Sequence, residues 1–291
     1  MNELTGTGIA LVTPFHQDGS IDFPALEKLV DYAIKGGVEY LVCLGTTAET
    51  PTLTKNEKKE IVSTIKSANA GRLPLVLGIG GNNTAEVKDE FSQTDLSDFL
   101  AVLSASPAYN KPTQEGIYQH YKALAENTEA KIILYNVPGR TSSNINPETT
   151  LRLAHDFKNI VAIKEASPNF LQSTEILKDK PEDFMVISGD DEFGLPMTLA
   201  GGKGVISVIA QGLPEEYTQM IRLGLERKVD EAYSLHYRLM DIIRSIYVEG
   251  NPCGIKSLLA HKGICKPFTR LPLVHASENL SKRIKELLEK L

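Results

Sequence analysis

The sequence predicts an α/β protein, a (β/α)8 barrel (TIM barrel) with a C-terminal helical extension. Eight short apolar, β-branched runs recur along the 291 residues, and stretches with helical spacing separate them. The runs are continuously apolar, as expected for strands buried on both faces of a parallel sheet. Eight such strands close a cylinder that side chains just fill. A doubly wound sheet is the weaker alternative, because Thr13-Pro14 follows the first run where that fold places a GxGxxG turn.

The predicted strands are residues 8–12, 40–44, 75–79, 99–103, 131–135, 160–164, 184–188 and 204–209. The predicted barrel helices are residues 22–37, 54–70, 84–96, 113–126, 147–157 and 214–226. Residues 22–37 illustrate the pattern: Leu26, Leu29, Val30 and Ala33 fall on one helical face, and two glycines then end the helix.

After about Glu226 the alternation stops, and three amphipathic helices are predicted over residues 229–247, 252–261 and 277–291. Ser277 is placed to cap the last of them. We therefore expect a catalytic barrel over residues 1–226 and a helical extension over residues 227–291 that packs on the barrel.

Composition limits the possible partners. The chain has 31 Lys and Arg against 37 Asp and Glu, a formal net charge of −6, and no long basic run. This balance argues against nucleic acid or an anionic membrane as the main partner. The three cysteines lack the spacing of a zinc site or a disulfide framework. The beginning of the sequence lacks the basic and apolar segments of a secretion signal, and no apolar run is long enough to cross a membrane. We expect a cytoplasmic protein.

Lys164 is the most informative residue, because it ends an apolar strand at the edge where barrels hold their active sites. Neighbouring strand residues point to opposite faces, so Glu165 is not expected to pair with Lys164. Desolvation favours a neutral amine that could form a Schiff base. A structural lysine that snorkels or forms a salt bridge is an equally good interpretation of this local pattern.

Other strand ends carry groups that could bind a carboxylate or transfer protons. Tyr135 could move protons, although a core tyrosine with a satisfied hydroxyl is the more usual outcome. Thr46 and Thr47 could hold a carboxylate, or they could simply form a turn. Arg140 could clamp a carboxylate or be an ordinary surface residue. No cluster of His, Asp or Glu has the spacing of metal ligands.

Together, three separated motifs are similar to those of the dihydrodipicolinate synthases, members of the pyruvate-dependent class I aldolase superfamily. They are GTTAE at 45–49, YNVPGRT at 135–141 and IKEA at 163–166. The likeness extends from residue 8 to the Asn251-Pro252 pair, nearly the whole chain.

The resemblance implies a role for each matching residue. Lys164 would form a Schiff base with pyruvate. Tyr135 would donate and accept protons, and Thr46 would relay them with Tyr135 and with Tyr109 from a neighbouring subunit. Thr47 would hold the pyruvate carboxylate, with backbone at Gly189 and Ile206 in the same pocket, and Arg140 would bind the second substrate, L-aspartate 4-semialdehyde. The resemblance further implies a lyase of lysine and diaminopimelate biosynthesis, a homotetramer built as a dimer of dimers, and no metal or organic cofactor.

The sequence departs from the family pattern at several positions. Ala48 replaces a usual glycine, and Thr50 replaces a common serine. Lys55 and Lys58 stand where lysine-regulated members often have histidine, and Ala108 stands where many have tyrosine; Asn82 and Glu86 match the regulated pattern. We expect weak or absent feedback inhibition by lysine.

Two alternatives remain. A sibling aldolase, such as N-acetylneuraminate lyase or a 2-keto-3-deoxy sugar-acid aldolase, would use the same lysine and tyrosine. The motif residues Thr46, Thr47, Tyr109 and Arg140 favour the synthase. A non-catalytic barrel used for binding is more remote, because such a protein would be expected to lose one of Lys164, Tyr135 and Thr46.

Overall fold

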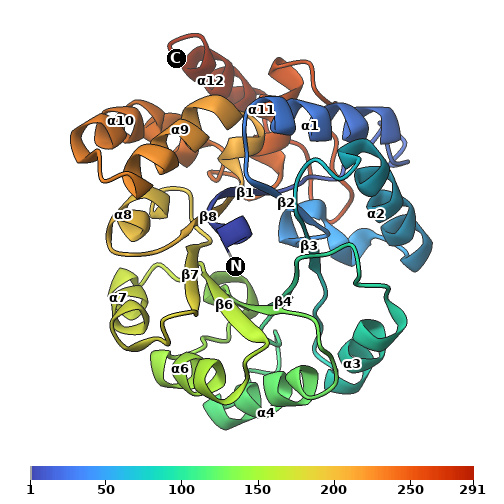
Figure 1. Cartoon of the computed structure of the whole chain (residues 1–291). Coiled ribbons are helices and arrows are strands. Elements are labelled where there is room, and N and C mark those ends of the chain that lie inside the picture. Colours follow the sequence, from blue (N-terminus) through green and yellow to red (C-terminus); the bar gives the residue numbers. More distant parts are fainter. Residues whose placement is uncertain (1) are drawn as a thin grey trace.

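A computed structural model describes residues 2–291; Met1, the first residue of the predicted barrel, lies outside the described residues. Eight strands form a closed barrel in the order β1 to β8, and all neighbouring pairs are parallel. Figure 1 views the molecule nearly along this barrel, with the helices arranged in a ring around the strands. The prediction of a (β/α)8 barrel is confirmed.

The strands are β1 Gly6–Ala10, β2 Tyr40–Cys43, β3 Leu75–Gly78, β4 Ala101–Ala105, β5 Ile132–Asn136, β6 Ile160–Glu165, β7 Met185–Ser188 and β8 Gly204–Ser207. Their residues are buried almost throughout, in agreement with the continuously apolar runs of the sequence. Two predicted strands are misplaced by two residues. The first strand was predicted at residues 8–12, whereas β1 occupies 6–10. The fourth was predicted at residues 99–103, whereas β4 occupies 101–105.

The helices are α1 Phe23–Lys35, α2 Lys55–Asn69, α3 Thr84–Gln93, α4 Gln114–Ala125, α5 Pro138–Thr141, α6 Pro147–Asp156, α7 Phe170–Asp179, α8 Gly194–Leu199, α9 Pro214–Leu225, α10 Val229–Ser245, α11 Cys253–His261 and α12 Glu278–Leu288. Short 3-10 helices are η1 Asn2–Leu4, η2 Thr46–Ala48, η3 Thr50–Thr52 and η4 Ile209–Gln211. The predicted helices are present, with ends differing by up to three residues. Three others, α5, α7 and α8, were not predicted.

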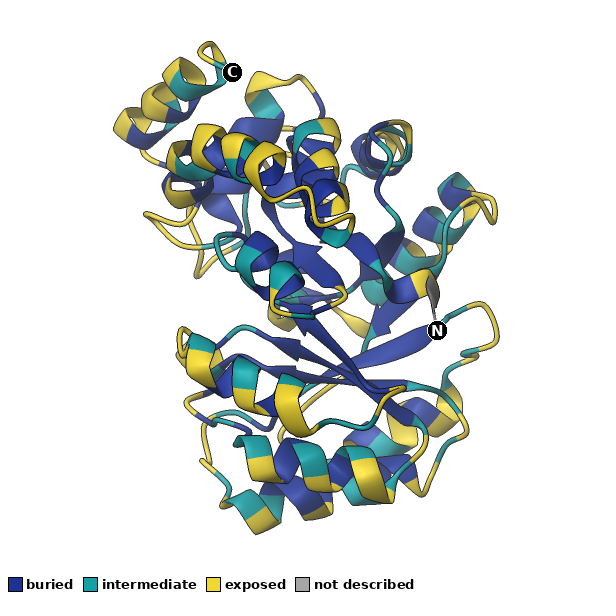
Figure 2. Cartoon of the chain, turned by 60° about the vertical axis from the view of Figure 1, so that its left-hand side comes forward, coloured by how far each residue is buried: buried dark blue, intermediate teal, exposed yellow. Residues whose placement is uncertain are grey.

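The apolar core has two layers. The larger layer fills the space between strands and helices, and the smaller one fills the barrel interior. Leu4 of η1 belongs to the interior layer and is fully buried, so η1 covers the barrel next to the amino end of β1. Figure 2 shows the consequence: the strands are buried, and most of the outer helices turn an exposed stripe to solvent. The carboxyl ends of the strands are left as the place for a site.

Helices α10 to α12 follow the barrel and lie beside α9 and α1 in Figure 1. Helix α10 packs against α8, α9 and α12, and α11 packs against α12. The Ser277 hydroxyl accepts a hydrogen bond from the Leu280 N–H, which confirms the predicted cap of α12. None of the helices in residues 2–291 is both long and apolar enough to cross a membrane.

Candidate active site

The amine of Lys164 lies against Tyr135 at the carboxyl ends of two adjacent strands. The two residues are paired in the β5–β6 ladder, and the Lys164 ammonium is 4.2 Å from the centre of the Tyr135 ring. Both side chains belong to the barrel interior, with exposed fractions of only 5% for Lys164 and 6% for Tyr135. Within residues 2–291 no carboxylate forms an ion pair with Lys164, so the interpretation as a salt-bridged structural lysine is not supported.

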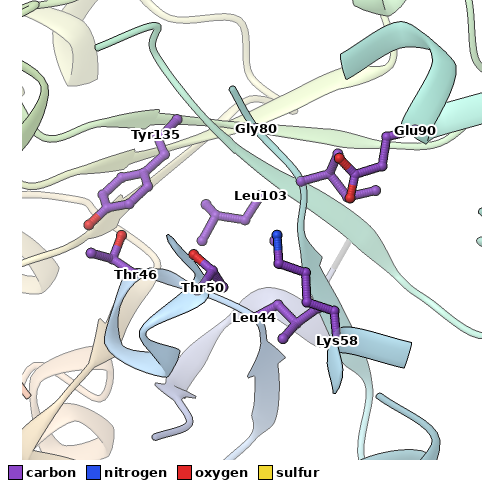
Figure 3. Close-up of a pocket in the computed structure, with 12 residues that line it drawn as sticks. Leu44, Thr46, Thr50, Lys58, Gly80, Glu90, Leu103 and Tyr135 are labelled. Atoms are coloured by element: carbon purple, nitrogen blue, oxygen red, sulfur yellow. The ribbon is translucent and has the colours of Figure 1, made fainter. Parts of the chain in front are cut away.

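A cavity of about 130 Å³ opens beside Tyr135, and Thr46 from η2 lines it as well. In Figure 3 the hydroxyls of Thr46 and Tyr135 point toward one another. Lys58 and Glu90 supply the charged part of the lining, so this space is polar on the side away from Tyr135. Two hydroxyls facing each other at the end of a buried strand could pass a proton without adding charge.

Thr47 and Arg140, the two predicted carboxylate binders, are linked by a residue of the C-terminal segment. The Asn251 side-chain amide donates to the Thr47 hydroxyl at 2.9 Å, and the Arg140 guanidinium donates to the Asn251 carbonyl at 3.4 Å. Thr47 is buried, whereas Arg140 is exposed on the short helix α5. One residue therefore places a buried hydroxyl and an exposed cation on the same side of the barrel.

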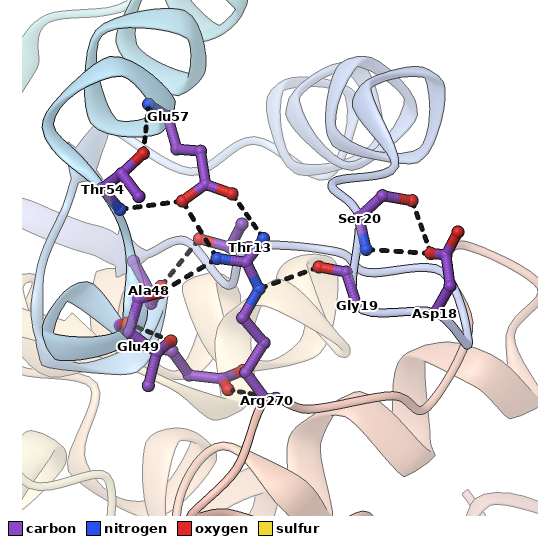
Figure 4. Close-up of polar contacts among 10 residues, drawn as sticks. Thr13, Asp18, Gly19, Ser20, Ala48, Glu49, Thr54, Glu57 and Arg270 are labelled. Carbon is purple, nitrogen blue, oxygen red and sulfur yellow. Dashed lines mark hydrogen bonds and ion pairs between the residues drawn. The ribbon is translucent and has the colours of Figure 1, made fainter.

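The loop that carries the two threonines is fixed by contacts from distant parts of the chain. Figure 4 shows part of this network around Glu49, which adopts left-handed backbone with φ 58°. The Thr13 hydroxyl donates to the Ala48 carbonyl at 2.7 Å, and the Arg270 N–H donates to the Glu49 carboxylate at 3.0 Å. The fully buried Lys256 ammonium donates to the same carboxylate at 2.5 Å. Burial lowers the pKa of Lys256 and the contact with Glu49 opposes this shift.

This geometry also explains why Ala48 can replace a glycine. The left-handed residue of the loop is Glu49, whereas Ala48 lies inside the 3-10 helix η2 and has ordinary backbone angles. A methyl group at position 48 therefore brings no backbone strain.

Gly189, which follows β7, leaves room for the lysine. A Cβ atom at this position would lie 3.0 Å from Cε of Lys164 and 2.6 Å from the Ala166 Cβ. Ile206 of β8 belongs to the same interior layer as Tyr135. Gly189 thus lies beside Lys164, and Ile206 lies in the barrel interior.

Tyr109 is the one predicted residue that this chain does not bring to its own site. Its side chain is 86% exposed, its φ is 68°, and within residues 2–291 its hydroxyl forms no hydrogen bond. Among the described residues its hydrogen bonding is limited to the backbone, where the Tyr109 N–H donates to the Thr141 carbonyl at 3.2 Å.

Several residues around the site were not foreseen from the sequence. Asn251, Lys256 and Arg270 come from the segment after residue 226, whereas Asn136 is next to Tyr135 and Asp191 lies two residues after Gly189. Asp191 is fully buried, accepts hydrogen bonds from the Ser207 and Tyr247 hydroxyls, and has a pKa raised by that burial. A polar residue at or shortly after the end of a buried strand was the available signal for Asn136, which ends β5, and for Asp191, three residues after β7. Asn251 was marked only as part of the family likeness, and nothing local marked Lys256 or Arg270.

A buried amine, a facing pair of hydroxyls and a nearby guanidinium can together activate a carbonyl compound and hold its carboxylate. An eight-stranded barrel with such a lysine at its strand ends defines the class: a lyase of the class I aldolase type, which works through a lysine Schiff base.

Comparison with known proteins identifies the family within that class. Residues 3–291 match the model of the dihydrodipicolinate synthetase family, and the chain belongs to this family. It is 59% identical over 284 residues to the 4-hydroxy-tetrahydrodipicolinate synthase of Flavobacterium psychrophilum, covering 98% of this chain and 97% of the relative.

Two solved structures have the same fold over nearly their whole length. The dihydrodipicolinate synthase of Thermotoga maritima superposes with a TM-score of 0.95 at 38% identity, covering 98% of each chain. That of Acinetobacter baumannii, solved in complex with pyruvate, gives 0.95 at 34% identity, with 99% of this chain and 98% of that one covered.

Proposed function

We propose that this protein is a 4-hydroxy-tetrahydrodipicolinate synthase, which condenses pyruvate with L-aspartate 4-semialdehyde in lysine and diaminopimelate biosynthesis. The observation that carries the proposal is the buried Lys164 amine, 4.2 Å from the ring centre of Tyr135 and without an ion-pair partner in residues 2–291. The names of the full-length relatives support the substrate pair. An unpaired amine in an apolar barrel has no evident structural use, but it is what a Schiff-base nucleophile requires.

In the proposed reaction the Lys164 amine attacks the keto carbon of pyruvate, and water leaves to form the imine. The imine withdraws electrons from the adjacent methyl group, so loss of a methyl proton gives an enamine. The enamine carbon then attacks the aldehyde carbon of the second substrate, whose oxygen takes up a proton. The amino group of that substrate attacks the imine carbon and displaces the Lys164 amine, which closes the product ring and frees the lysine. Tyr135 is the donor and acceptor for these transfers, because its ring contacts Lys164 and its hydroxyl faces Thr46.

The two substrate carboxylates need separate binding groups. We assign the pyruvate carboxylate to the Thr47 hydroxyl, with backbone at Gly189 and Ile206 lining the pocket. We assign the carboxylate of the semialdehyde to Arg140, which is exposed at the edge of the site. A small buried substrate and a larger one entering from solvent fit this division.

We further propose that the protein is a cytoplasmic homotetramer, a dimer of dimers, in which Tyr109 reaches the site of a neighbouring subunit and joins the relay of Thr46 and Tyr135. The exposed Tyr109 side chain in left-handed backbone supports this assignment, since such a conformation is rarely held without a use. Residues 1–226 would form the catalytic barrel, and residues 227–291 a helical extension that supports it.

The competing function is that of a sibling aldolase acting on sugar acids through the same lysine. The Arg140 guanidinium favours the synthase, because a polyhydroxylated substrate has less need of a cation placed for a second carboxylate.

Borohydride trapping tests the chemistry directly. The protein is incubated with pyruvate and sodium borohydride, and the modified peptide is identified by mass spectrometry. We expect one reduced pyruvate adduct on Lys164 in the wild type and none in Lys164→Met. Absence of the wild-type adduct would contradict the Schiff-base mechanism. Turnover of aspartate semialdehyde against that of sugar acids then separates the two aldolases.

A further inference from the structure

The structure contains a buried carboxylate that the proposed chemistry does not use. Glu165 follows Lys164 on β6, is 1% exposed, and points to the face of the sheet away from the barrel interior. Within residues 2–291 it has no cationic partner. A buried charge is costly unless its oxygens are hydrogen-bonded, so its partners are informative.

All hydrogen-bond partners of Glu165 are neutral donors. The Asn136 side-chain amide lies 3.0 Å from each carboxylate oxygen, the Ser167 N–H is at 2.7 Å, and the Gln172 side-chain amide is at 2.8 Å. Burial raises the pKa of Glu165, and these three contacts oppose the rise. Since every contact donates to the oxygens, the surroundings fit the carboxylate form of this side chain.

Asn136 is held as firmly as Glu165. It is fully buried, and its side-chain oxygen accepts from the Ile145 N–H at 2.9 Å, while its amide also donates to the Asn144 side chain at 2.9 Å. These bonds leave the amide nitrogen of Asn136 directed at Glu165, so the pair has one fixed orientation.

The positions of the two residues connect this pair to the chemistry. In the β5–β6 ladder Asn136 is paired with Glu165, and Tyr135 is paired with Lys164 one step earlier. The same ladder changes register between Ile132 and Ile133, so its backbone pairing is irregular near the amino end. A cross-strand bond at the carboxyl end therefore fixes β5 against β6 where the reactive side chains leave the strands.

We propose that Glu165 is a positioning residue of the active site: bonded to Asn136 on the outer face, it sets the placement of Lys164 relative to Tyr135 on the inner face. The proposal rests on the proposed roles of Lys164 and Tyr135. A displacement of about 1 Å between reacting groups can lower a rate by about a hundredfold. Such a bond across the ladder can thus matter to catalysis without touching substrate.

Glu165→Gln tests the proposal with little change of shape. The new amide would either set an N–H donor against the Asn136 donor or remove the acceptor oxygen from the Ser167 or Gln172 donor, so we expect the pair to separate. We expect kcat/KM for pyruvate to fall about ten- to a hundredfold, with a slower rate of adduct formation on borohydride trapping. In a Tyr135→Phe background, where the alignment no longer serves proton transfer, the same change should reduce kcat much less.

Asn69→Asp is the matched control. Asn69 is equally buried and bonds the Leu73 backbone at 2.8 and 3.1 Å, but it lies before the amino end of β3, away from the site. The Asn69→Asp substitution should lower the melting temperature without changing the rate of adduct formation. If Glu165→Gln does not fold, Gln172→Ala, which removes one donor to Glu165, should give a smaller loss of the same kind.

The results separate this inference from the proposed function. No adduct in the wild type would remove the Schiff-base mechanism itself. If the wild type forms the adduct and the folded Glu165 or Gln172 variant forms it at the same rate, only the positioning role is overturned. Equal losses of kcat in the Tyr135 and Tyr135→Phe backgrounds would also overturn it, because they would show a general effect on folding.

Discussion

The Asn251 amide donates a 2.9 Å hydrogen bond to the hydroxyl of Thr47, across 204 residues of sequence. The Asn251 side-chain oxygen is buried and has no hydrogen-bond partner in residues 2–291. Because the amide nitrogen uses the Thr47 oxygen as its acceptor, the Thr47 proton is free to be donated elsewhere. The contact therefore leaves the Thr47 hydroxyl able to donate, as its proposed role toward the pyruvate carboxylate requires.

Asn251→Ala should weaken pyruvate binding. Without the amide, the Thr47 hydroxyl can rotate, and we expect KM for pyruvate to rise about tenfold while kcat changes less, as for the loss of about 1.4 kcal/mol of binding. In a Thr47→Val background, Asn251→Ala should change the KM for pyruvate much less. Asn279→Ala, at an exposed position of α12, is the control and should leave KM unchanged. An unaltered KM in Asn251→Ala would show that the bond does not prepare the hydroxyl.

Tyr135→Phe should lower turnover by about a hundredfold or more while the protein stays folded. The hydroxyl is removed, but the ring that contacts Lys164 and the interior layer is retained. Steady-state rates and circular dichroism measured on the same preparation provide the test. Near-normal turnover would exclude Tyr135 from proton transfer.

The strands could be predicted because parallel barrel strands are apolar throughout, and this property is visible in single segments. The misplacement of β1 has a local cause. Its first residues, Gly6 to Gly8, are small and resemble a loop, whereas the apolar Leu11 and Val12 follow the strand. Lys164 and Tyr135 were accessible to prediction for the same reason as the strands, since each stands out at the end of an apolar run.

The residues that hold the site in place could not be predicted from single segments of the sequence. Asn251 and Lys256 reach Thr47 and Glu49 across more than 200 residues. Such contacts depend on how α11 packs against the barrel, and no periodicity in one sequence reports it. The Asn136–Glu165 bond could be predicted only in part. The alternation of strand residues predicted that Glu165 faces away from Lys164, but it did not predict which residue Glu165 contacts.

Gly189→Ala should impair Lys164 without removing it. The added methyl group would lie 2.6 Å from the Ala166 Cβ and 3.0 Å from Cε of Lys164, closer than van der Waals contact allows. We expect the lysine to be displaced, with kcat/KM for pyruvate reduced about ten- to a hundredfold. Gly139→Ala, where a Cβ meets nothing within 4 Å, is the matched control. Equal activities of the two variants would indicate that the chain around Gly189 shifts at no functional cost.

Glu57 should contribute to stability in a defined acidic range. Its carboxylate binds the Arg270 guanidinium at 2.5 and 3.0 Å and caps α2, and these contacts lower its pKa to about 2. A group whose pKa is depressed by folding stabilises the protein above its unfolded pKa and loses that contribution as the pH falls through its folded value. Glu57→Gln should therefore lower the free energy of unfolding at neutral pH and approach the wild type between about pH 4 and pH 2. A stability difference that stays constant over this range would show that the charge of Glu57 is not responsible.

Feedback inhibition by L-lysine should be weak or absent. Lys58 lines the cavity next to Thr46 and Tyr135, and Lys55 lies three residues earlier at the start of α2. An incoming lysine carries two ammonium groups, which these side chains would repel at short range. Added lysine should leave most of the activity at saturating pyruvate, and Lys58→His, which removes a permanent cation at neutral pH, should increase the sensitivity. Initial rates measured over a range of lysine concentrations decide the question. Strong inhibition of the wild type at low lysine concentration would refute the prediction and indicate that Asn82 and Glu86, which match the regulated pattern, are sufficient.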